Sequence, residues 1–365
     1  YNALYCPDFP LQFEAIRQLT LQKYIYIFVK KINMSTTILA IETSCDDTSA
    51  SVISDDIIKS NIVSSQLDHS KLGGVVPEIA SRKHQKNITY IVNRALIESS
   101  TKLSMLNAIA CTNGPGLLGS LLVGTSFAKS ISYSLGIPLI CVDHIKAHAL
   151  SHTINTSKVD FPFISLVVSG GHTQIMYIES YDNIKILGET RDDAVGEAFD
   201  KCGKIMGLDY PAGPLIDVLS KDGDTFKFNF PNTKVPGMDF SFSGIKTSFL
   251  YFINDNLNAN KNFITENLND IASSIQYKLV EMVIDKLKIA LKEYKVSNIA
   301  VGGGVAANSL LRNRLMKLEN EMNIKVNISD IQYCTDNAAM IANFSRFMYK
   351  DKKFSRYDSV PFSKN

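Results

Sequence analysis

The fold is decided by two stretches of sequence with the same layout, ILAIETSCDDTSASVI at residues 38–53 and FISLVVSGGHTQIMYI at residues 163–178. In each stretch, two apolar runs flank a short polar or glycine-containing turn, which is the pattern of a β-hairpin. The first turn is rich in polar and acidic residues, and we expect its tip to be exposed. Two such units, one in each half of the chain, predict two related lobes around a cleft.

Helical and strand-like segments alternate around these hairpins, which predicts an α/β protein. Apolar residues recur at helical spacing in residues 86–98 and 270–294, and a helix of small residues is predicted at 118–135. Residues 222–246 are rich in Gly, Pro, Phe and Asn, and we expect them to form a long loop.

The composition restricts the classes of function. The chain has 365 residues, of which 45% are hydrophobic, and 38 basic residues against 36 acidic ones give a net charge of +2. Any nucleic-acid partner must therefore meet a local basic patch. Six scattered cysteines form no C-x-x-C pair, which favours a reducing compartment. No apolar run is long enough to cross a membrane, so we expect a soluble protein without a membrane partner.

Residues 1–33 differ from the rest of the chain. Met34 directly precedes the first strand, and the segment before it has one Arg, no Ser and two acidic residues, unlike an organellar transit peptide. We expect an extension that is disordered or not native, with a divergent presequence as the alternative. It also carries four basic residues, so residues 34–365 have no net charge.

A pair of histidines is the first candidate for chemistry. His144 and His148 are four residues apart, so on a helix both imidazoles face the same side. They are a workable pair of metal ligands, although surface or structural histidines have the same spacing. Ile145 stands where a zinc protease of the H-E-x-x-H type needs its glutamate, which disfavours that mechanism. A third ligand would be a carboxylate, and Asp336 is one candidate.

Two glycine turns are candidate nucleotide sites. Residues 169–171 could present backbone N–H groups to a phosphate, or form an ordinary tight turn. Residues 302–304 follow a predicted strand and precede a helix, where Asn308 could reach a base or ribose. Neither a Walker P-loop nor the G-x-G-x-x-G fingerprint is present.

Carboxylates gather in the first hairpin turn, at Asp46 and Asp47, and in an acidic cluster on a predicted helix. The cluster comprises Asp192, Asp193, Glu197 and Asp200. Such groups can accept a proton or bind ribose hydroxyls, and they can equally be solvated caps. Cys45 is a poor nucleophile candidate, because the adjacent negative charge raises the pKa of a thiol.

From Met34 to about Ala342 the chain carries a series of short motifs in one order. They are IETSCD (41–46), GGVVPEIASR (73–82), GPGL (114–117), His144 with His148, VSGGHT (168–173), GEAFDK (196–201), DFSFSG (239–244), GGV (303–305) with Asn308, and CTDN (334–337). This series resembles the tRNA N6-adenosine threonylcarbamoyltransferases, the TsaD family, once described as O-sialoglycoprotein endopeptidases.

The resemblance implies an actin-like ATPase (ribonuclease H-like) fold of two lobes. The first lobe would span residues 34–142 and the second residues 143–365, with the C-terminal tail returning to the first. It also implies a divalent metal in the cleft, Fe²⁺ with Zn²⁺ as the alternative, held by His144, His148 and Asp336.

The resemblance further implies which residues bind the nucleotide part of the substrate. These are Val167, Val168, Ser169, Gly170, Gly171, Asp200, Gly213, Asp217 and Asn308. The implied catalytic residues are Asp46, Asp47 and Ser169, with Asp46 as the proton acceptor or amine-positioning group. The family commonly has Asp-Glu where this chain has Asp46-Asp47, which leaves the role of Asp47 open. Ala212 stands where glycine is usual before Gly213.

The implied reaction transfers a threonylcarbamoyl group from threonylcarbamoyl-adenylate to N6 of adenosine 37 in tRNAs that read codons beginning with adenine. Implied partners are tRNA, with a TsaB-like paralogue and a TsaE-like ATPase in bacteria, or a second copy of the chain in mitochondria. We expect a bacterial cytoplasmic protein, with an organelle as the alternative. Two rival functions stay open: a small-molecule phosphotransferase of the same fold, and a catalytically silent nucleotide-binding scaffold.

Overall fold

The computed structural model describes residues 35–66, 74–156, 158–232 and 235–363. Thr37–Asn365 form one compact unit. The extension predicted at residues 1–33 lies outside the described residues. Within the described part of the chain, no helix combines the length and the apolar character needed to cross a membrane.

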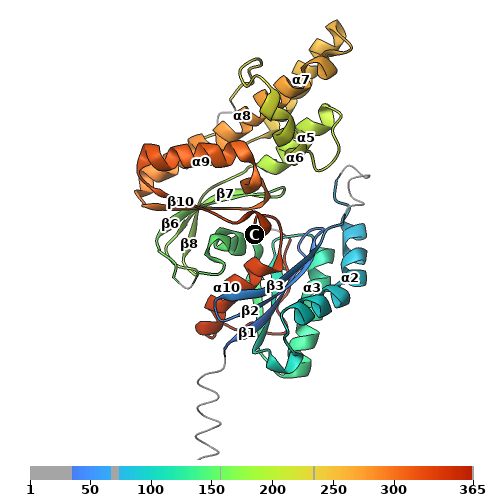
Figure 1. Ribbon diagram of the computed structural model, residues 1–365, viewed down its shortest axis with the longest axis vertical. Helices are drawn as coiled ribbons and strands as arrows, with labels where there is room; N and C mark the ends of the chain where they lie inside the picture. Colours follow the sequence, from blue (N-terminus) through green and yellow to red (C-terminus); the bar gives the residue numbers. More distant parts are fainter. Residues whose placement is uncertain (1–34, 67–73, 157, 233–234, 364–365) are drawn as a thin grey trace, which may run out of the picture. The chain divides into compact units, whose positions relative to one another are not determined.

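Two five-stranded sheets of identical topology form the framework (Figure 1). Their strand orders are β3-β2-β1-β4-β5 and β8-β7-β6-β9-β10, and in both the first three strands are antiparallel while the last two add in parallel. The strands are β1 Thr37–Glu42, β2 Thr48–Ser54, β3 Ile57–Ser64, β4 Ala108–Gly114, β5 Leu139–Asp143, β6 Phe163–Val168, β7 Thr173–Ile178, β8 Ile184–Glu189, β9 Asn298–Gly302 and β10 Lys325–Ile328. The two-lobed α/β fold expected from the paired hairpins is confirmed.

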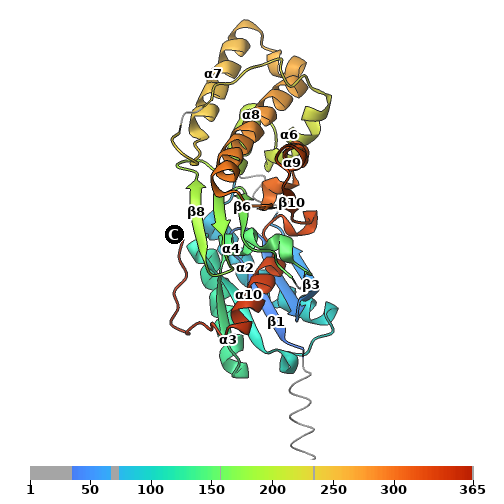
Figure 2. The same cartoon turned by 90° about the vertical axis from the view of Figure 1, so that its left-hand side faces the viewer.

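Helices cover both faces of the first sheet. Along β1, Leu39 and Ile41 pack into a cluster with α2 (Pro77–Glu98) and α3 (Leu118–Leu135), whereas Ile38 and Ala40 pack with α10. This alternation follows from the two-residue period of a strand. Helix α10 (Ala338–Lys350) comes from the far end of the chain and lies along β1 and β2 (Figure 2).

The second sheet carries a larger set of helices. They are α5 Val195–Ile205, α6 Ala212–Leu219, α7 Ser243–Ala259, α8 Phe263–Tyr294 and α9 Ser309–Met322, and most of their buried residues join one core with β6, β7 and β9. Short 3-10 helices span Leu103–Met105, Ser151–Thr153, Ser220–Asp222, Gly304–Ala307 and Ile331–Tyr333. Helices α5 to α9 thus cover one face of the second sheet with apolar residues.

The short helix α4 (His144–Ala149) occupies the core that the two sheets share. This core combines residues of β1, β4 and β5 with residues of β6, β7 and α10. The predicted lobe boundary, between residues 142 and 143, falls at the end of β5 and stays a prediction. Any side chain on α4 is thereby held at the junction of the two sheets.

Observed boundaries match the sequence patterns unevenly. Helix α3 spans the predicted residues, but α2 and α8 begin earlier than expected, at Pro77 and Phe263, and α8 is kinked at Asn267. Helix α2 is extended by proline at its first helical position, and α8 by Phe263 and Ile264, which pack against the core before the regular apolar stripe begins. Strands β3, β8 and β10 were not predicted, because half-exposed edge strands carry a weak apolar pattern.

The expectation of an exposed first hairpin tip is wrong. Glu42, Thr43 and Ser44 are buried, and Asp46 and Asp47 are half-buried. The tip is covered because Leu117 N donates to Ser44 O, and because the ring of His84 contacts both Cys45 O and Thr48. The turn is therefore part of the interior from which a site can be built.

Candidate active site

Helix α4 begins directly after β5 and carries the histidine pair. The Asp143 side chain caps it by accepting from Lys146 N at 3.0 Å. His144 and His148 lie one turn apart with ring centroids 4.7 Å from each other, and both are at least 95% buried. As the spacing predicted, both imidazoles point to one side of the helix.

Asp336 completes this group from the loop before α10. Its Oδ1 lies 3.0 Å from His148 Nε2 and 3.4 Å from His144 Nε2. In the described ranges these three residues are the one cluster of His, Cys, Asp or Glu with ligand atoms close enough for a metal, all within 4.8 Å of one another. The structure thus brings together the three predicted ligands, which come from segments nearly 190 residues apart in sequence.

A buried carboxylate that sequence reasoning missed stands behind His144. Glu42 Oε2 lies 3.1 Å from His144 Nδ1, and Ser44 Oγ lies 3.1 Å from the same nitrogen. Glu42 also accepts from Thr112 Oγ1 and from Ser44 N, both at 2.5 Å. Its position, last in β1 and second in the IETSCD motif, was the available signal.

The ionisable groups of this cluster shift the pKa values of one another. Burial raises the pKa of Asp336, but His144 and His148 outweigh it and bring the pKa well below its usual range. Burial lowers the pKa of His144, yet Asp336 and Glu42 outweigh it and raise the pKa well above its usual range. For His148, burial outweighs the hydrogen bond with Asp336, and the pKa of this imidazole falls below its usual value. The buried carboxylate of Glu42 and the half-buried carboxylate of Asp336 thus favour positive charge on or beside the two rings.

The same residues fit a divalent metal ion. Two imidazole nitrogens and one carboxylate oxygen form a donor set that suits Fe²⁺ or Zn²⁺. The Nε2 atoms of both histidines face Asp336, while a second carboxylate contacts the outer nitrogen of His144, an arrangement common behind metal-bound histidines.

The acidic turn faces this cluster. Burial raises the pKa of the Asp47 carboxyl to about 7, against a hydrogen bond from Ser65 that lowers it, and the carboxylates of Asp336, Asp46 and Glu42 raise it further. Burial and the neighbouring Asp46 also raise the pKa of the Cys45 thiol well above its usual value. The prediction that Cys45 is a poor nucleophile is confirmed.

The second hairpin turn approaches the cluster from the other sheet. His172 lies 6.3 Å from His144 between ring centroids, and burial together with His144 lowers the pKa of His172 to about 4, so the ring is neutral near pH 7. The sequence interpretation quoted His172 in a motif but assigned it no role. Both turns therefore meet at the beginning of α4.

The three amides of the glycine turn are only partly available to a phosphate. Ser169 N donates to His172 O at 2.8 Å, and Gly171 N donates to the hydroxyl of its neighbour Ser169 at 3.3 Å. Two of the three amides thus have partners within the turn, and the hypothesis that residues 169–171 present N–H groups to a phosphate stays a prediction. Around Gly170 and Gly171 there is open space on the side where a Cβ would stand.

Gly303 and Gly196 serve close packing around this turn. Gly303 has φ +92°, and a Cβ there would lie 2.3 Å from Val168 O. Gly196 similarly meets Ser169 O and the backbone of Gly170. Val167 and Val168 are buried in β6. The glycine run at β9 thus lets the backbone approach β6, with a 3-10 turn between it and α9 instead of the direct helix start expected.

The remaining predicted nucleotide residues gather at two helix starts. Asp200 Oδ1 accepts from Ala212 N at 2.8 Å and from Gly213 N at 3.4 Å, at the beginning of α6. Asp217 accepts from Ser309 N and Oγ at the beginning of α9, where Asn308 is the N-cap. Asn308 also donates to Gln276 at 2.7 Å. These two helix starts lie in the second lobe's helical layer.

The predicted acidic cluster divides between separate tasks. Asp192 accepts from Ser241 and from Ser243, and so anchors the loop before α7. Asp193 and Glu197 both pair with Lys201. Of the four acidic residues, Asp200 is the one that points to a helix start shared with other predicted site residues.

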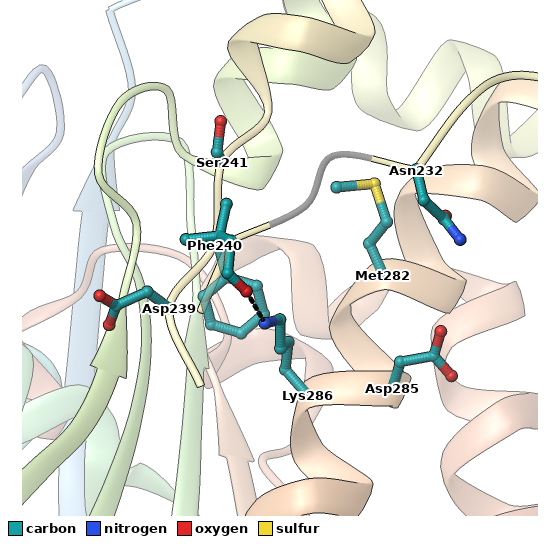
Figure 3. Close-up of a pocket in the computed structure, with 8 residues that line it drawn as sticks. Asn232, Asp239, Phe240, Ser241, Met282, Asp285 and Lys286 are labelled. Carbon is teal, nitrogen blue, oxygen red and sulfur yellow. Dashed lines mark hydrogen bonds between the residues drawn. The ribbon is translucent and has the colours of Figure 1, made fainter. Parts of the chain in front are cut away.

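A cavity of about 260 Å³ lies elsewhere in the second lobe, between α8 and the segment before α7 (Figure 3). It is lined by Asn232, Val235, Asp239, Phe240, Ser241, Met282, Asp285 and Lys286. Lys286 Nζ donates to Val235 O at 2.8 Å and to Gly237 O at 2.6 Å. No predicted site residue lines this cavity, and its lysine is engaged in holding a loop.

Two sheets of the same topology around a shared core give the two-lobed α/β arrangement of the actin-like ATPase fold. Solved structures share this fold. Full-length HypF in its phosphate- and nucleotide-bound form superposes with a TM-score of 0.60 at 13% identity, over 88% of this chain and 47% of that one. Component A of the Acidaminococcus fermentans (R)-2-hydroxyglutaryl-CoA dehydratase superposes with a TM-score of 0.50 at 12% identity, over 88% of this chain and 100% of that one. At these identities the likeness concerns the fold alone.

Sequence comparisons identify the family to which this chain belongs. The family model of the tRNA N6-adenosine threonylcarbamoyltransferases, TsaD, matches residues 57–343, and the chain belongs to this family. A protein of that name from Cytophaga hutchinsonii is 49% identical over 90% of this chain and 96% of its own length. Another protein of that name, from Christiangramia forsetii, is 50% identical over 88% of this chain and 95% of its own length. The resemblance inferred from the motifs is confirmed.

Proposed function

We propose that this protein transfers the threonylcarbamoyl group of threonylcarbamoyl-AMP to N6 of adenosine 37 in tRNAs that read codons beginning with adenine. The observation that carries the proposal is the match to relatives that bear the name of this transferase, at about half identity over about 90% of this chain. The match extends over at least 95% of the length of these relatives, so it includes both sheets and both turns of this chain.

The reaction joins a weak nucleophile to an activated carbonyl. The exocyclic N6 amine attacks the carbamoyl carbon, the bond from that carbon to the phosphate oxygen breaks, and AMP leaves with the electron pair. Negative charge grows on the carbamoyl and phosphate oxygens, and the amine must lose a proton. The protein therefore has to supply positive charge or N–H donors on one side and a base on the other.

In this proposal His144, His148 and Asp336 hold one divalent cation, Fe²⁺ with Zn²⁺ as the alternative. The bound cation supplies Lewis-acid stabilisation of oxygen charge. Support comes from the donor set, from the burial of both histidines, and from the excess of buried carboxylate around them. The ligands lie on α4 and before α10, which pack against each other in the shared core, so the metal position is rigid.

Asp47 is our candidate for the base that takes the N6 proton. A base works best when its pKa is close to the working pH, and the pKa of Asp47 is raised to about 7. This revises the sequence hypothesis, which favoured Asp46 as the acceptor. Asp46 then acts as the neighbour that positions the amine. Both residues stand half-buried in the turn that faces the histidine cluster.

The second lobe holds the nucleotide. Open space around Gly170 and Gly171 lets a phosphate approach the turn, while the hydroxyl of Ser169 keeps the turn in shape by accepting from Gly171 N and His172 N. Asp200, Gly213, Asp217 and Asn308 lie at the starts of α6 and α9, where a ribose or base would bind. The helix starts also carry the partial positive charge that anions prefer.

The proposed function also implies binding partners and a cellular location. tRNA is the second substrate, and because residues 34–365 have no net charge, a local patch or basic surface from partner proteins must supply its contacts. We propose a TsaB-like paralogue and a TsaE-like ATPase as those partners in a bacterial cytoplasm, with a homodimer in an organelle as the alternative.

A reconstitution tests this function. Purified protein is incubated with tRNA, threonine, bicarbonate, ATP and the adenylate-forming enzyme, with each candidate partner set, and the nucleosides are analysed by mass spectrometry. We expect threonylcarbamoyladenosine. Its absence with every partner set would overturn the proposal, and phosphorylation of a small molecule from ATP would support the rival phosphotransferase.

A further inference from the structure

Glu42 is an unusual residue for the centre of a sheet. It is the last residue of β1, its relative exposure is 0%, and it has neighbouring strands on both sides. A buried carboxylate is strongly unfavourable unless each of its oxygens accepts hydrogen bonds. A carboxylate kept at such a position therefore has to be held by specific donors.

The donors of Glu42 come from three directions. Oε1 accepts from Ser44 N in the hairpin turn, and Oε2 accepts from Thr112 Oγ1 on the neighbouring strand β4. The third contact is His144 Nδ1, 3.1 Å from Oε2. The first two contacts fix the carboxylate from its own turn and from β4, so that it presents one oxygen to the imidazole from a rigid base.

The contact between Glu42 and His144 determines which ring nitrogen of His144 has a free lone pair. An ionised carboxylate only accepts hydrogen bonds, so the nitrogen that contacts it must be the one that carries hydrogen. With hydrogen on Nδ1, a neutral imidazole keeps its lone pair on Nε2. That nitrogen points toward Asp336 and lies on the same side as His148 Nε2.

The other histidine has no such anchor. His148 Nδ1 is buried and has no hydrogen-bond partner among the described residues, and the hydrogen bond of this ring runs from Nε2 to Asp336. The two members of the pair therefore differ. One is oriented at Nδ1 by a carboxylate from the first sheet, and the other is held by packing and by the contact of its Nε2 with Asp336.

We propose that Glu42 is a positioning residue, which fixes the Nδ1–H tautomer and the ring orientation of His144 so that Nε2 is presented for metal binding. The inference rests on the metal site of the proposed function and adds to it a residue from the first hairpin. It ties the geometry of the metal ligand to the β1–β2 turn that carries Asp46 and Asp47.

The variant Glu42→Gln tests this directly in the full chain. Glutamine has the same shape, but its amide NH₂ can donate to His144 Nδ1 and so favour the wrong tautomer. We expect the affinity for Zn²⁺, measured by competition with a chromophoric chelator, to fall about 10- to 100-fold. Glu98→Gln, the same change at an exposed position at the end of α2, is the matched control, and its affinity should equal that of the wild type.

The outcomes separate the two claims. If the wild type binds Zn²⁺, His144→Ala does not, and Glu42→Gln binds as the wild type does, the positioning role is wrong while the metal site stands. If His144→Ala binds as tightly as the wild type, the metal site itself is wrong, and the inference falls with it.

A measurement on the wild type keeps the test independent of how the variants fold. In histidine-labelled protein with Zn²⁺ bound, ¹H–¹⁵N spectra report which ring nitrogen carries hydrogen, and His144→Ala identifies the resonance. We expect hydrogen on Nδ1 of His144. Hydrogen on Nε2 would overturn the proposal.

Discussion

The two lobes place turns of opposite character at equivalent positions of equivalent sheets. The β1–β2 turn carries Glu42, Asp46 and Asp47, which are buried or half-buried carboxylates, whereas the β6–β7 turn carries Ser169, two glycines and a neutral His172. Both turns reach the start of α4, through Glu42 on one side and His172 on the other. The topology supplies the same location twice, and the turn residues decide the chemistry. We assign charge and proton transfer to the first turn and nucleotide binding to the second.

The largest effect should come from removing the group where the two turns meet. His144→Ala deletes a metal ligand and leaves Glu42 with one donor fewer, so we expect loss of stoichiometric metal and a fall in kcat of about 1000-fold, which corresponds to several kcal/mol of transition-state stabilisation. Metal analysis and the transfer assay check both. Lys146→Ala on the same helix is the control, and metal retained by His144→Ala would contradict the ligand assignment.

The next effect tests whether the first turn transfers the proton. The raised pKa of Asp47 means that its carboxylate is ionised only above about pH 7, so the rate of the wild type should rise as the pH passes through 7. Asp47→Asn should lower the rate about 100-fold and abolish this rise. A pH–rate profile under single-turnover conditions is the measurement, with Asp46→Asn for comparison. If Asp46→Asn, and not Asp47→Asn, removed the pH dependence, the base would be Asp46.

The same carboxyl gives a stability prediction of defined sign. Its pKa is higher in the folded protein than the usual 3.8, so the unfolded state ionises first and the fold is destabilised as the pH rises from about 4 to about 7. The substitution Asp47→Asn should therefore raise the free energy of unfolding at pH 8 by up to about 4 kcal/mol and leave it nearly unchanged at about pH 4. Urea unfolding at the two pH values measures this, and equal effects at both would contradict the raised pKa.

A glycine pair tests the second turn. Gly303→Ala should destabilise the fold by about 2 to 4 kcal/mol, because the new Cβ would meet Val168 O at 2.3 Å in a backbone conformation that favours glycine. Gly171→Ala has open space and should unfold as the wild type does. We expect it instead to weaken AMP binding about tenfold, as measured by calorimetry. An unchanged affinity for AMP would show that the phosphate does not bind at this turn.

The smallest effect should come from Ser169→Ala. It deletes the hydroxyl that accepts from Gly171 N and His172 N, each bond contributing about 1 kcal/mol. The freed amides can then turn to solvent or phosphate, so we expect KM for the adenylate to change less than tenfold while kcat stays constant. A large fall in kcat would give Ser169 a direct catalytic role.

Much of the architecture was predictable from sequence, since the hairpins and the α3 pattern are local. The histidine pair was predictable because its spacing has meaning on one helix, even on one as short as α4. Asp336 was one carboxylate among many until the family resemblance singled it out, since no local rule connects it with a helix almost 190 residues away.

Other features depend on three-dimensional packing. The burial of the first turn results from contacts with Leu117 and His84, which no hairpin pattern reveals. The role of Glu42 depends on the register of β1 against β4, which places Thr112 beside it. The partners of Ser169 within its own turn likewise follow from geometry that the glycine motif does not fix.

The most direct test of the central claim is a single-turnover transfer. The protein, with the partners that give activity, is mixed with threonylcarbamoyl-AMP labelled in the threonyl group and with tRNA that carries either adenosine or guanosine at position 37. The account predicts label in the adenosine tRNA, none in the guanosine tRNA, and none in either with His144→Ala. Label in both tRNAs, or full transfer by His144→Ala, would contradict it.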